Sequence, residues 1–522
     1  MDGESTTEEP SDRPPANANK GQLARNVASS YVSLFVGVLL SLFLTRVLLR
    51  HLGAGTYGLW IVLFAMVGYL GLLDVGVGTA VVQRIARLMA QHDDAGVADL
   101  MRTAWWFFAT SGVVAVLVTV VVAPFIGSIL HLGTLSPTIA AITLVLLGAM
   151  TAVLFLQSVP NAVLFGSGRA DRSAQVGLLT LVLTQGAQIV VVVDGAGLVG
   201  LAIVSVVGAA IGLGVGASLI HRVTGSSIRH GRFNRPLLAE LLVFGGRQSV
   251  ISLGGIVSYQ LDALIIGIIL PVAQVAPYNI ALSTANLSRN LSTQGTSLLL
   301  PTFAHFETVG DRERQARMFF RSVLFGLAIS LPILIALAGF GDPILKLWLG
   351  TVPPKTYEIM IVLGLVTTLQ LPGNQCFNFL TGVGRVQLIM RLAIVGAIVN
   401  LAGSIGATFW LGPVGPAVGS LPVVLVLDFV LLPVIVCRYV QVPIGRYVRE
   451  ALIPLLPASL AGGAVALALV AWAPARTGVG AVVEAAITVV VSWAALGGFL
   501  LRVDPTARRA LWSRLRLSLI HI

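Results

Sequence analysis

Six ionisable residues interrupt the long apolar stretches of this 522-residue chain: Asp74, Arg247, Asp262, Arg289, Asp428 and Glu484. A charge in an apolar membrane segment costs roughly 3 kcal/mol or more, so it faces a protein interior or a watery cavity. Such residues mark binding, gating or ion-coupling sites. No role follows from the sequence for Asp428 or Glu484, and the other four carry distinct chemistry.

Arg289 lies within “STANLSRNLSTQGTS” (283–297), a stretch of amides and hydroxyls that includes Asn286 and Asn290. A helix this polar must face water or protein. The guanidinium is permanently charged, planar and able to hydrogen-bond phosphate oxygens in pairs. Arg289 is therefore a candidate ligand for a phosphate-bearing substrate. The alternative is a structural ion pair with a neighbouring helix.

Asp262 lies in the preceding, antiparallel apolar stretch. Counted from the turn near Val272, Asp262 and Arg289 differ in depth by seven residues, which is about 10 Å of helix. This offset allows a water-bridged or state-dependent pair, and a permanent salt bridge is the alternative. Asp262 is accordingly a candidate gating or coupling residue.

Asp74 stands in “YLGLLDVGVGTAVVQRIAR” (69–87), two residues before Gly76 and four before Gly78. Each glycine weakens a helix by about 1 kcal/mol relative to alanine, so the pattern predicts a bend. With Arg84 ten residues further on, Asp74 is expected about 10–15 Å inside the cytoplasmic face. We interpret Asp74 as fixing an inner gate. A static helix contact and a proton-coupling carboxylate are the alternatives.

Two further arginines open matching apolar stretches, Arg25 in “ARNVASS” and Arg247 in “GGRQSVIS”. They are candidates for collecting an anionic group at the inner mouth. Ordinary anchoring of a span by positive charge explains them as well. Arg46 and Arg50 are predicted on the outer side, where they could line an exit.

The elements that must hold these residues are membrane helices. The chain is 56% hydrophobic and 11% charged, with a mean hydropathy of +0.92, whereas soluble domains are about 25% charged. About 20 apolar residues cross a bilayer core, and this length predicts an all-α protein of fourteen spans. The predicted spans are 24–45, 57–82, 104–130, 139–165, 174–193, 196–220, 242–270, 276–303, 318–340, 356–381, 388–410, 414–437, 451–472 and 479–501.

The distribution of basic residues sets the expected topology. With both termini in the cytoplasm, the inside segments hold 26 of the 33 basic residues and the outside loops hold five. Basic residues favour the cytoplasmic side, so the net charge of +11 reflects topology and nucleic-acid binding is not expected. The two cysteines, Cys376 and Cys437, offer no metal-ligand spacing or disulfide framework, and no metal site is expected.

The domain organisation follows from the spans and a duplication. Three pairs of similar segments are 216 to 221 residues apart. They are Gly166-x-Gly168-Arg169 with Gly382-x-Gly384-Arg385, Arg102 with Arg321, and Tyr57 with Tyr278. We expect two six-helix lobes related by a pseudo-twofold axis along the membrane normal, with a cavity between them. The predicted units are a disordered cytoplasmic tail (1–22), an N-lobe (23–222), a C-lobe (237–437), a helix pair (450–501) and a basic cytoplasmic tail (502–522).

Two segments resemble a known family. “GAGTYGLWIVLFAMVGYLGLLDVGVGTAVVQRIAR” (53–87) and “SYQLDALIIGIILPVAQVAPYNIALSTANLSRNLSTQGTSLLLPTFAHFE” (258–307) are similar to polysaccharide-transport proteins. These are the Wzx-type flippases, in the superfamily that also holds MATE drug exporters and lipid II flippases. The resemblance covers roughly residues 22–440 and implies alternating access between two lobes.

The resemblance also implies cargo and place. The cargo would be a polyprenyl-diphosphate-linked glycan moved across the bacterial cytoplasmic membrane, with a polysaccharide polymerase and glycosyltransferases as further partners. No cofactor is expected, and coupling to H⁺ or Na⁺ is left open. The glycan itself is not identified.

Other functions would call for different features of the sequence. A MATE-like exporter of cationic drugs would favour an acidic or aromatic cavity, which Arg289 does not provide. A lipid II-type flippase would differ only in substrate. A membrane glycosyltransferase or polymerase needs carboxylates on sizeable outer loops, and the longest predicted outer loop spans only 341–355. The protein is therefore not expected to be an enzyme; a passive scaffold is the remaining alternative.

Overall fold

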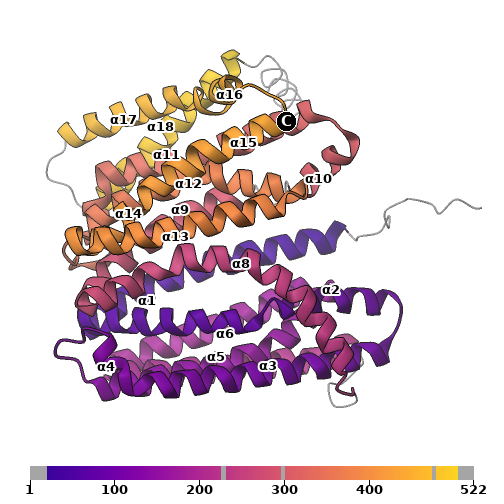
Figure 1. Ribbon diagram of the computed structural model, residues 1–522. Helices are drawn as coiled ribbons and strands as arrows, with labels where there is room; N and C mark the ends of the chain where they lie inside the picture. The colour runs from indigo at the N-terminus through magenta and orange to yellow at the C-terminus, as the bar shows by residue number, and fades with distance from the viewer. Residues whose placement is uncertain (1–19, 225–230, 295–299, 473–477, 504–522) are drawn as a thin grey trace, which may run out of the picture.

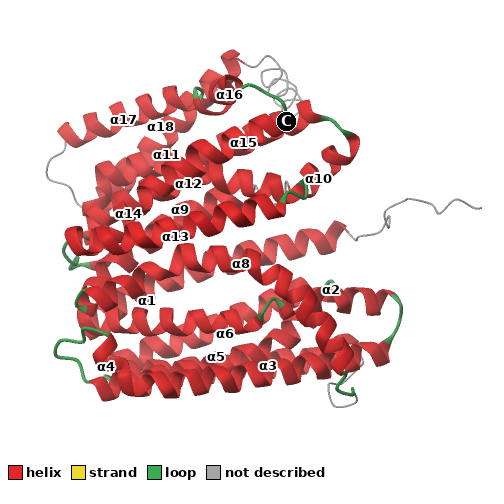
Figure 2. Cartoon of the chain, in the orientation of Figure 1, coloured by secondary structure: helices red, strands yellow, loops and turns green. Residues whose placement is uncertain are grey.

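The computed structural model describes residues 20–224, 231–294, 300–472 and 478–503. Within these ranges the chain forms helices and connecting turns, with no β-strand (Figure 2). Ten segments of the described chain are long and apolar enough to cross a membrane. The protein is therefore an all-helical, multi-pass membrane protein.

The helices of the N-terminal half are α1 (Lys20–Gly68), α2 (Val77–Ala90), α3 (Asp94–Val122), α4 (Ile126–Ile129), α5 (Pro137–Gly166), α6 (Ala170–Val193) and α7 (Gly197–Thr224). The short 3-10 helix η1 (Tyr69–Asp74) joins α1 to α2. The prediction of a loop at residues 46–56 is wrong, because α1 continues through this segment and only Gly53 departs from helical geometry. There φ is 75° and ψ is 168°, a conformation that glycine adopts without strain.

The C-terminal half contains α8 (Arg235–Ile269), α9 (Val275–Gln294), α10 (Leu300–Val309), α11 (Arg312–Leu349), α12 (Thr356–Gly382), α13 (Val386–Leu411), α14 (Gly415–Val423) and α15 (Leu432–Tyr439). The turn η4 (Val272–Gln274) connects α8 to α9, and the π-helix η7 (Val424–Leu431) connects α14 to α15. The final elements are α16 (Ile444–Tyr447), η8 (Val448–Leu452), α17 (Leu455–Trp472) and α18 (Gly478–Val503).

The bundle has two chemically different ends, at the right and left of Figure 1. At the arginine-rich end lie the turns between α2 and α3, α5 and α6, α10 and α11, and α12 and α13, with arginines close to each. At the opposite end lie α4, η4 and the turn between α11 and α12. Figure 1 shows the two halves converging at the opposite end.

The apolar cores follow the same division. One core contains residues of both halves at the opposite end, including Leu48, Tyr57, Val272, Tyr278 and Met360. A second core belongs to α2, α3 and α5, with one residue each from α7 and α8. A third belongs mainly to α10, α11, α12 and α15, with further residues from α13, α16, η8 and α17. The two halves thus share a core at the opposite end, whereas at the arginine-rich end each has a core of its own and α8 contributes Leu241 to that of the N-terminal half.

Local structure repeats at the duplicated sequences. Gly168 and Gly384 both adopt positive φ, of 73° and 79°, directly after helices that contain Pro160 and Pro372. In both turns the amide following the glycine donates a hydrogen bond back into the preceding helix. Asp93 and Asp311 likewise cap α3 and α11 by accepting from the amide three residues on. These matched turns support the predicted duplication locally.

The final two helices pack on the outside of the C-terminal half, against α11. Trp493 of α18 donates to the Ala328 carbonyl over 2.8 Å. Arg446 donates to both Glu313 and Glu450 at 2.6 to 2.8 Å. Nearby, Glu307 of α10 accepts hydrogen bonds from the side chains of Gln315 and Tyr439, which lower the pKa of its carboxyl.

Candidate functional site

Arg289 is half-buried on α9, fourteen residues from the first residue of that helix. This corresponds to about 21 Å along the axis, well inside a bilayer core. Asn286, three residues earlier, shares its part of the helix surface, and Asn290 follows it directly in the chain; both are also half-buried. The predicted polar environment of Arg289 is therefore present within the membrane segment.

The buried face of α9 is held by hydroxyls. Ser288 shares a hydrogen bond of 3.2 Å with Ser330 of α11, and Ser330 shares one of 2.8 Å with Thr368 of α12. Ser292 bonds to the Ser288 carbonyl one turn away. These hydrogen bonds fix the rotation of α9 about its axis. Arg289 lies next to Ser288 in the chain, and its side chain therefore leaves the helix beside this bonded face.

Asp262 is bonded to Tyr278, whose hydroxyl donates to its carboxylate. Tyr278 is fully buried, three residues into α9. Since Arg289 is eleven residues beyond Tyr278, or about 16 Å along the same helix, this bond holds Asp262 away from the depth of Arg289. The described hydrogen-bond partner of Asp262 is thus Tyr278. In the sequence, Tyr278 stands out only because it lies 221 residues after Tyr57 in the duplicated segments.

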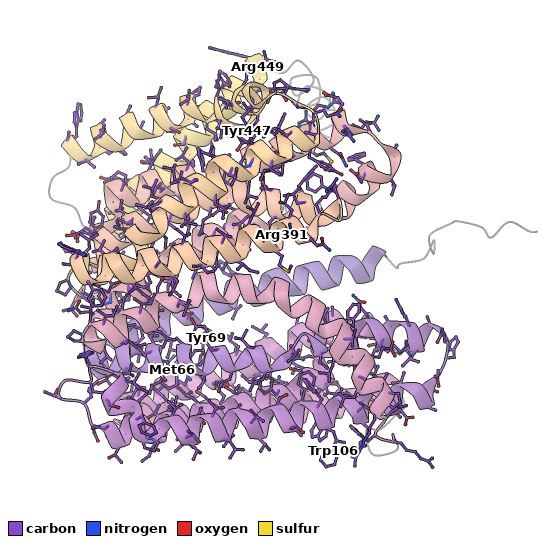
Figure 3. All side chains as sticks on the ribbon, in the orientation of Figure 1. Met66, Tyr69, Trp106, Arg391, Tyr447 and Arg449 are labelled. Carbon is purple, nitrogen blue, oxygen red and sulfur yellow. The ribbon has the colours of Figure 1, made fainter. Side chains whose placement is uncertain are left out.

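Tyr69 adds a third group to this interface. Its hydroxyl is buried without a hydrogen-bond partner among the described residues, within electrostatic range of Asp262. Figure 3 shows Tyr69 on the N-terminal half, where η1 contacts α8. Tyr69, Asp262 and Tyr278 therefore meet where α8 and α9 face the end of α1, a cluster that no spacing in the sequence indicates.

At Asp74 the helix is broken. Val75 and Gly76 both have left-handed backbone conformations, with φ of 49° and 66°. One carboxylate oxygen of Asp74 accepts from the Gly78 amide over 3.0 Å, which satisfies a free donor at the N-terminus of α2 and complements the helix dipole. The predicted bend is confirmed as a complete break; the gating role of Asp74 remains a prediction.

Helix α8 approaches this break directly. A Cβ on Gly245 would lie 2.5 Å from the Val75 carbonyl oxygen, so the two backbones are in contact. Arg84 of α2 forms an ion pair of 3.2 Å with Glu240 of α8, beside a small cavity of about 130 Å³ that Arg87 also lines. Glu240 and Gly245 had no marker in the sequence, because nothing in a single helix shows where its neighbour crosses.

The remaining predicted residues are placed less fully. Arg25 lies in α1 and Arg247 in α8, and both side chains are outside the described part of the structure. Asp428 lies in the π-helix η7, with its carboxylate directly against Gly373 of α12. Cys376 and Cys437 are free and buried. Within the described ranges, no cluster of His, Cys, Asp and Glu side chains has a metal-binding arrangement.

Two neighbouring cavities lie in the N-terminal half. The smaller, about 300 Å³, is lined by Asp74 and by residues of α1 and α5. The larger, about 560 Å³, is lined by α1, α5, α6, α7 and the first turns of α9. Phe64, Met150 and Leu154 line both cavities, so the break at Asp74 and the larger cavity are adjacent.

A family model described as “Polysaccharide biosynthesis protein” matches residues 43–352, more than half of the chain. The protein belongs to this family. The membership confirms the resemblance carried by the segments 53–87 and 258–307. No curated protein matches the sequence.

Solved structures show the fold of this family member. The lipid II flippase MurJ in an inward closed conformation matches with a TM-score of 0.71 and 14% identity, over 91% of this chain and 99% of MurJ. An inward-facing MATE multidrug transporter of the MOP superfamily matches at 0.60 and 17%, over 80% and 99% of the two chains. The MATE multidrug transporter DinF-BH matches at 0.57 and 16%, over 83% and 98%. The chain therefore belongs to a family of polysaccharide biosynthesis proteins, and its fold is similar to that of these solved flippase and transporter structures.

Proposed function

We propose that the protein is a flippase that moves a polyprenyl-diphosphate-linked oligosaccharide from the cytoplasmic to the outer leaflet during polysaccharide biosynthesis. The observation that carries the proposal is Arg289, half-buried on a polar face of α9 about 21 Å from the helix start. A guanidinium at that depth suits a diphosphate, which must cross the apolar layer with its charge compensated. Family membership supports the glycan as the rest of the cargo.

The proposed mechanism is alternating access between lobes 23–222 and 237–437, with fourteen spans and both termini in the cytoplasm of a bacterial cell. The arginine-rich end is then cytoplasmic. A core shared at the opposite end, with largely separate cores joined through α8 at the arginine-rich end, supports an inward-facing arrangement. In this state Arg289, Asn286 and Asn290 would receive the diphosphate, Arg25 and Arg247 would collect it at the mouth, and coupling to H⁺ or Na⁺ would act through Asp74 or Asp262.

A second candidate is a lipid II-type flippase, favoured by the match to MurJ along almost its whole length. Both functions move a polyprenyl diphosphate, and they differ in the head group. A MATE-like drug exporter is less well supported, because the charged residue on the polar face of α9 is a cation and would repel cationic drugs.

The test is transport in proteoliposomes that contain undecaprenyl-diphosphate-linked oligosaccharide, with exposure of the glycan measured by an added glycosidase. We expect Arg289→Ala to lower the rate at least about tenfold, the value of a charged hydrogen-bonded contact. Arg289→Lys should be partly active, since it keeps the charge and loses the planar fork. Arg172→Ala is the matched control, because Arg172 is exposed and bonds to Gln175 of its own helix. Full transport by Arg289→Ala at equal expression would exclude the diphosphate site.

A further inference from the structure

The larger cavity of the N-terminal half is lined by many polar side chains, and none of the described residues that line it is charged. Its polar groups are neutral amides and hydroxyls, including Gln157, Thr184, Gln188 and Asn279. Trp60 and Phe64 of α1, with ring centroids 6.0 Å apart, supply aromatic surface. At about 560 Å³ it falls within the size range of ligand pockets, roughly 300–1,000 Å³.

Two polar atoms of this wall are buried without partners. The Thr180 hydroxyl and the Gln185 side-chain carbonyl oxygen have no hydrogen-bond partner among the described residues. Each such group costs about 1–3 kcal/mol in the folded protein. By contrast, Gln188 on the same helix is bonded to Ser205 of α7 at 3.0 Å. Both side chains line the cavity, so a side-chain rotation would turn each covered, unpaired group toward a ligand that offers hydroxyls.

The backbone of α7 brings these groups close together. A Cβ on Gly208 would lie 1.9 Å from the Thr184 hydroxyl oxygen, and one on Gly212 would lie 2.7 Å from the Gln157 amide nitrogen. Glycines spaced four residues apart let membrane helices approach closely. The close approach of α7 thus holds the side chains of Thr184 and Gln157 in place on the polar wall of the cavity.

A stripe of polar residues on α9 connects this cavity to the depth of Arg289. Asn279 and Ser283 line the cavity, and Asn286 and Asn290 continue the same face, since the spacings of four, three and four residues keep one side of a helix. Ser283 lies six residues, or about 9 Å, from Arg289. One elongated ligand can therefore contact the cavity and Arg289 together.

We propose that this cavity binds the neutral sugar units next to the diphosphate, while Arg289 binds the diphosphate itself. The inference rests on the proposed flippase function and names the chemistry of the head group: uncharged and rich in hydroxyls. Amides and hydroxyls recognise sugar hydroxyls by hydrogen bonds, and the aromatic rings cover their apolar faces. An acidic or cationic head group would find no compensating charge among the described residues of this lining.

Protection of single cysteines tests the proposal. Thr184→Cys reports the cavity, Asn286→Cys reports the level of Arg289, and Ala95→Cys at the exposed start of α3 reports reagent access alone. The probes are undecaprenyl diphosphate, and the same lipid carrying a neutral disaccharide of N-acetylglucosamine and galactose. We expect both probes to slow modification at position 286, and only the glycan-bearing probe to slow it at position 184, by about fivefold or more.

The outcomes separate the two proposals. Protection at position 286 without protection at position 184 by the glycan-bearing probe would overturn the sugar site and leave the flippase function intact. Absence of protection at both positions would overturn the proposed function and the sugar site with it. Protection of position 184 by a cationic rhodamine dye in place of the glycan would assign the cavity to cationic drugs.

A pair of conservative variants separates binding from folding. Thr180→Val removes an unpaired hydroxyl, so thermal stability should be unchanged or raised while the glycan-bearing probe protects position 184 about fivefold less. The control is Thr143→Val in α5, outside the cavity, where the lost hydroxyl is bonded to the Ile139 carbonyl at 2.7 Å. It should lower stability without changing protection. Full protection in Thr180→Val would show that the unpaired hydroxyl does not meet the ligand.

Discussion

The side-chain amide of Asn279 donates a hydrogen bond to the Tyr57 hydroxyl over 3.0 Å, across helices that are 222 residues apart in sequence. Tyr57 is only 2% exposed, and its neighbour Gly58 lies against the backbone of η4. The residue before Asn279, Tyr278, donates to Asp262 within the C-terminal half. The hydrogen bond from Asn279 to Tyr57 therefore joins the two halves inside an apolar layer.

Removal of the Tyr57 hydroxyl should loosen this contact. Tyr57→Phe leaves the half-buried Asn279 amide without its acceptor, at a cost of about 1–3 kcal/mol. The population open at the opposite end should therefore rise by about five- to hundredfold. The measurement is labelling of a cysteine at Val272 by an impermeant reagent added from outside. Unchanged labelling in Tyr57→Phe would show that the bond does not hold the two halves together.

Gly58→Ala should have a stronger effect than any side-chain deletion at this contact. A Cβ on Gly58 would come 2.0 Å from the Val272 carbonyl oxygen, a backbone atom that cannot rotate away. We expect normal membrane insertion and loss of transport, because the opposite end cannot close. Gly55→Ala is the matched control: it lies three residues earlier, and its nearest atom, on the flexible Leu135 side chain, is 4.0 Å away. Equal activity of the two variants would contradict this expectation.

Asp74→Asn separates charge from hydrogen bonding at the helix break. The amide can still accept from the Gly78 nitrogen, so expression should be unchanged, whereas the loss of charge at the start of α2 should slow transport if Asp74 fixes the gate. Gly76→Ala should also slow transport, since a left-handed alanine costs about 1–2 kcal/mol. Gly71→Ala, with open space around it, is the control. Normal transport rates in Asp74→Asn would favour a static helix contact.

The ion pair between Arg84 and Glu240 can be tested by charge exchange. Arg84→Glu places two acids together, so it should weaken the contact of α2 with α8 and lower the transport rate. The double variant Arg84→Glu with Glu240→Arg should restore part of that rate. Both side chains are partly exposed, so the coupling from a double-mutant cycle should be only about 0.2–1 kcal/mol. Additive effects of the two single substitutions would show that the pair is not formed during transport.

The proposed topology makes a simple prediction. Reporters fused after Ile522 and inserted in the turn at Gly310 should be cytoplasmic, and a reporter at Gly133 should be periplasmic. Gly310 and Gly133 both adopt positive φ in turns with open space around them. The loop residue Gly231 is a poorer site, because it lies directly against the Ala98 backbone. Periplasmic activity at Gly310 would reverse the assignment of the two ends.

Much of the fold could be predicted from the sequence, because long apolar runs leave helices as the simplest way to satisfy the backbone in a membrane. The turns at Gly168 and Gly384 and the break near Gly76 also have local causes, since glycine tolerates the left-handed conformation. Val75 shares that conformation without any marker. The backbone of Gly245 lies against the Val75 carbonyl, and a contact between segments so far apart in the chain leaves no local pattern in the sequence.

The candidate site was only partly predictable. Arg289 could be recognised from the sequence alone, because a charged residue within a long apolar segment is rare. The partner of Asp262 could not, because the meeting of Asp262 and Tyr278 depends on the rotation and depth of two helices relative to each other. The uncharged cavity had no marker at all: Thr180, Gln185 and Gln157 come from different turns and helices, and each alone looks like an ordinary polar residue.

The core that both halves share at the opposite end also has an electrical meaning. The shared core is a layer of aliphatic and aromatic side chains in which the hydroxyls of Tyr57 and Tyr278 are already bonded, so most of its thickness gives a bare ion no replacement for its water shell. This layer is therefore expected to oppose ion flow as well as to close the opposite end. If the protein is the proposed flippase, a membrane could hold many copies without losing its ion gradients, and ions would leak mainly while the two halves are apart.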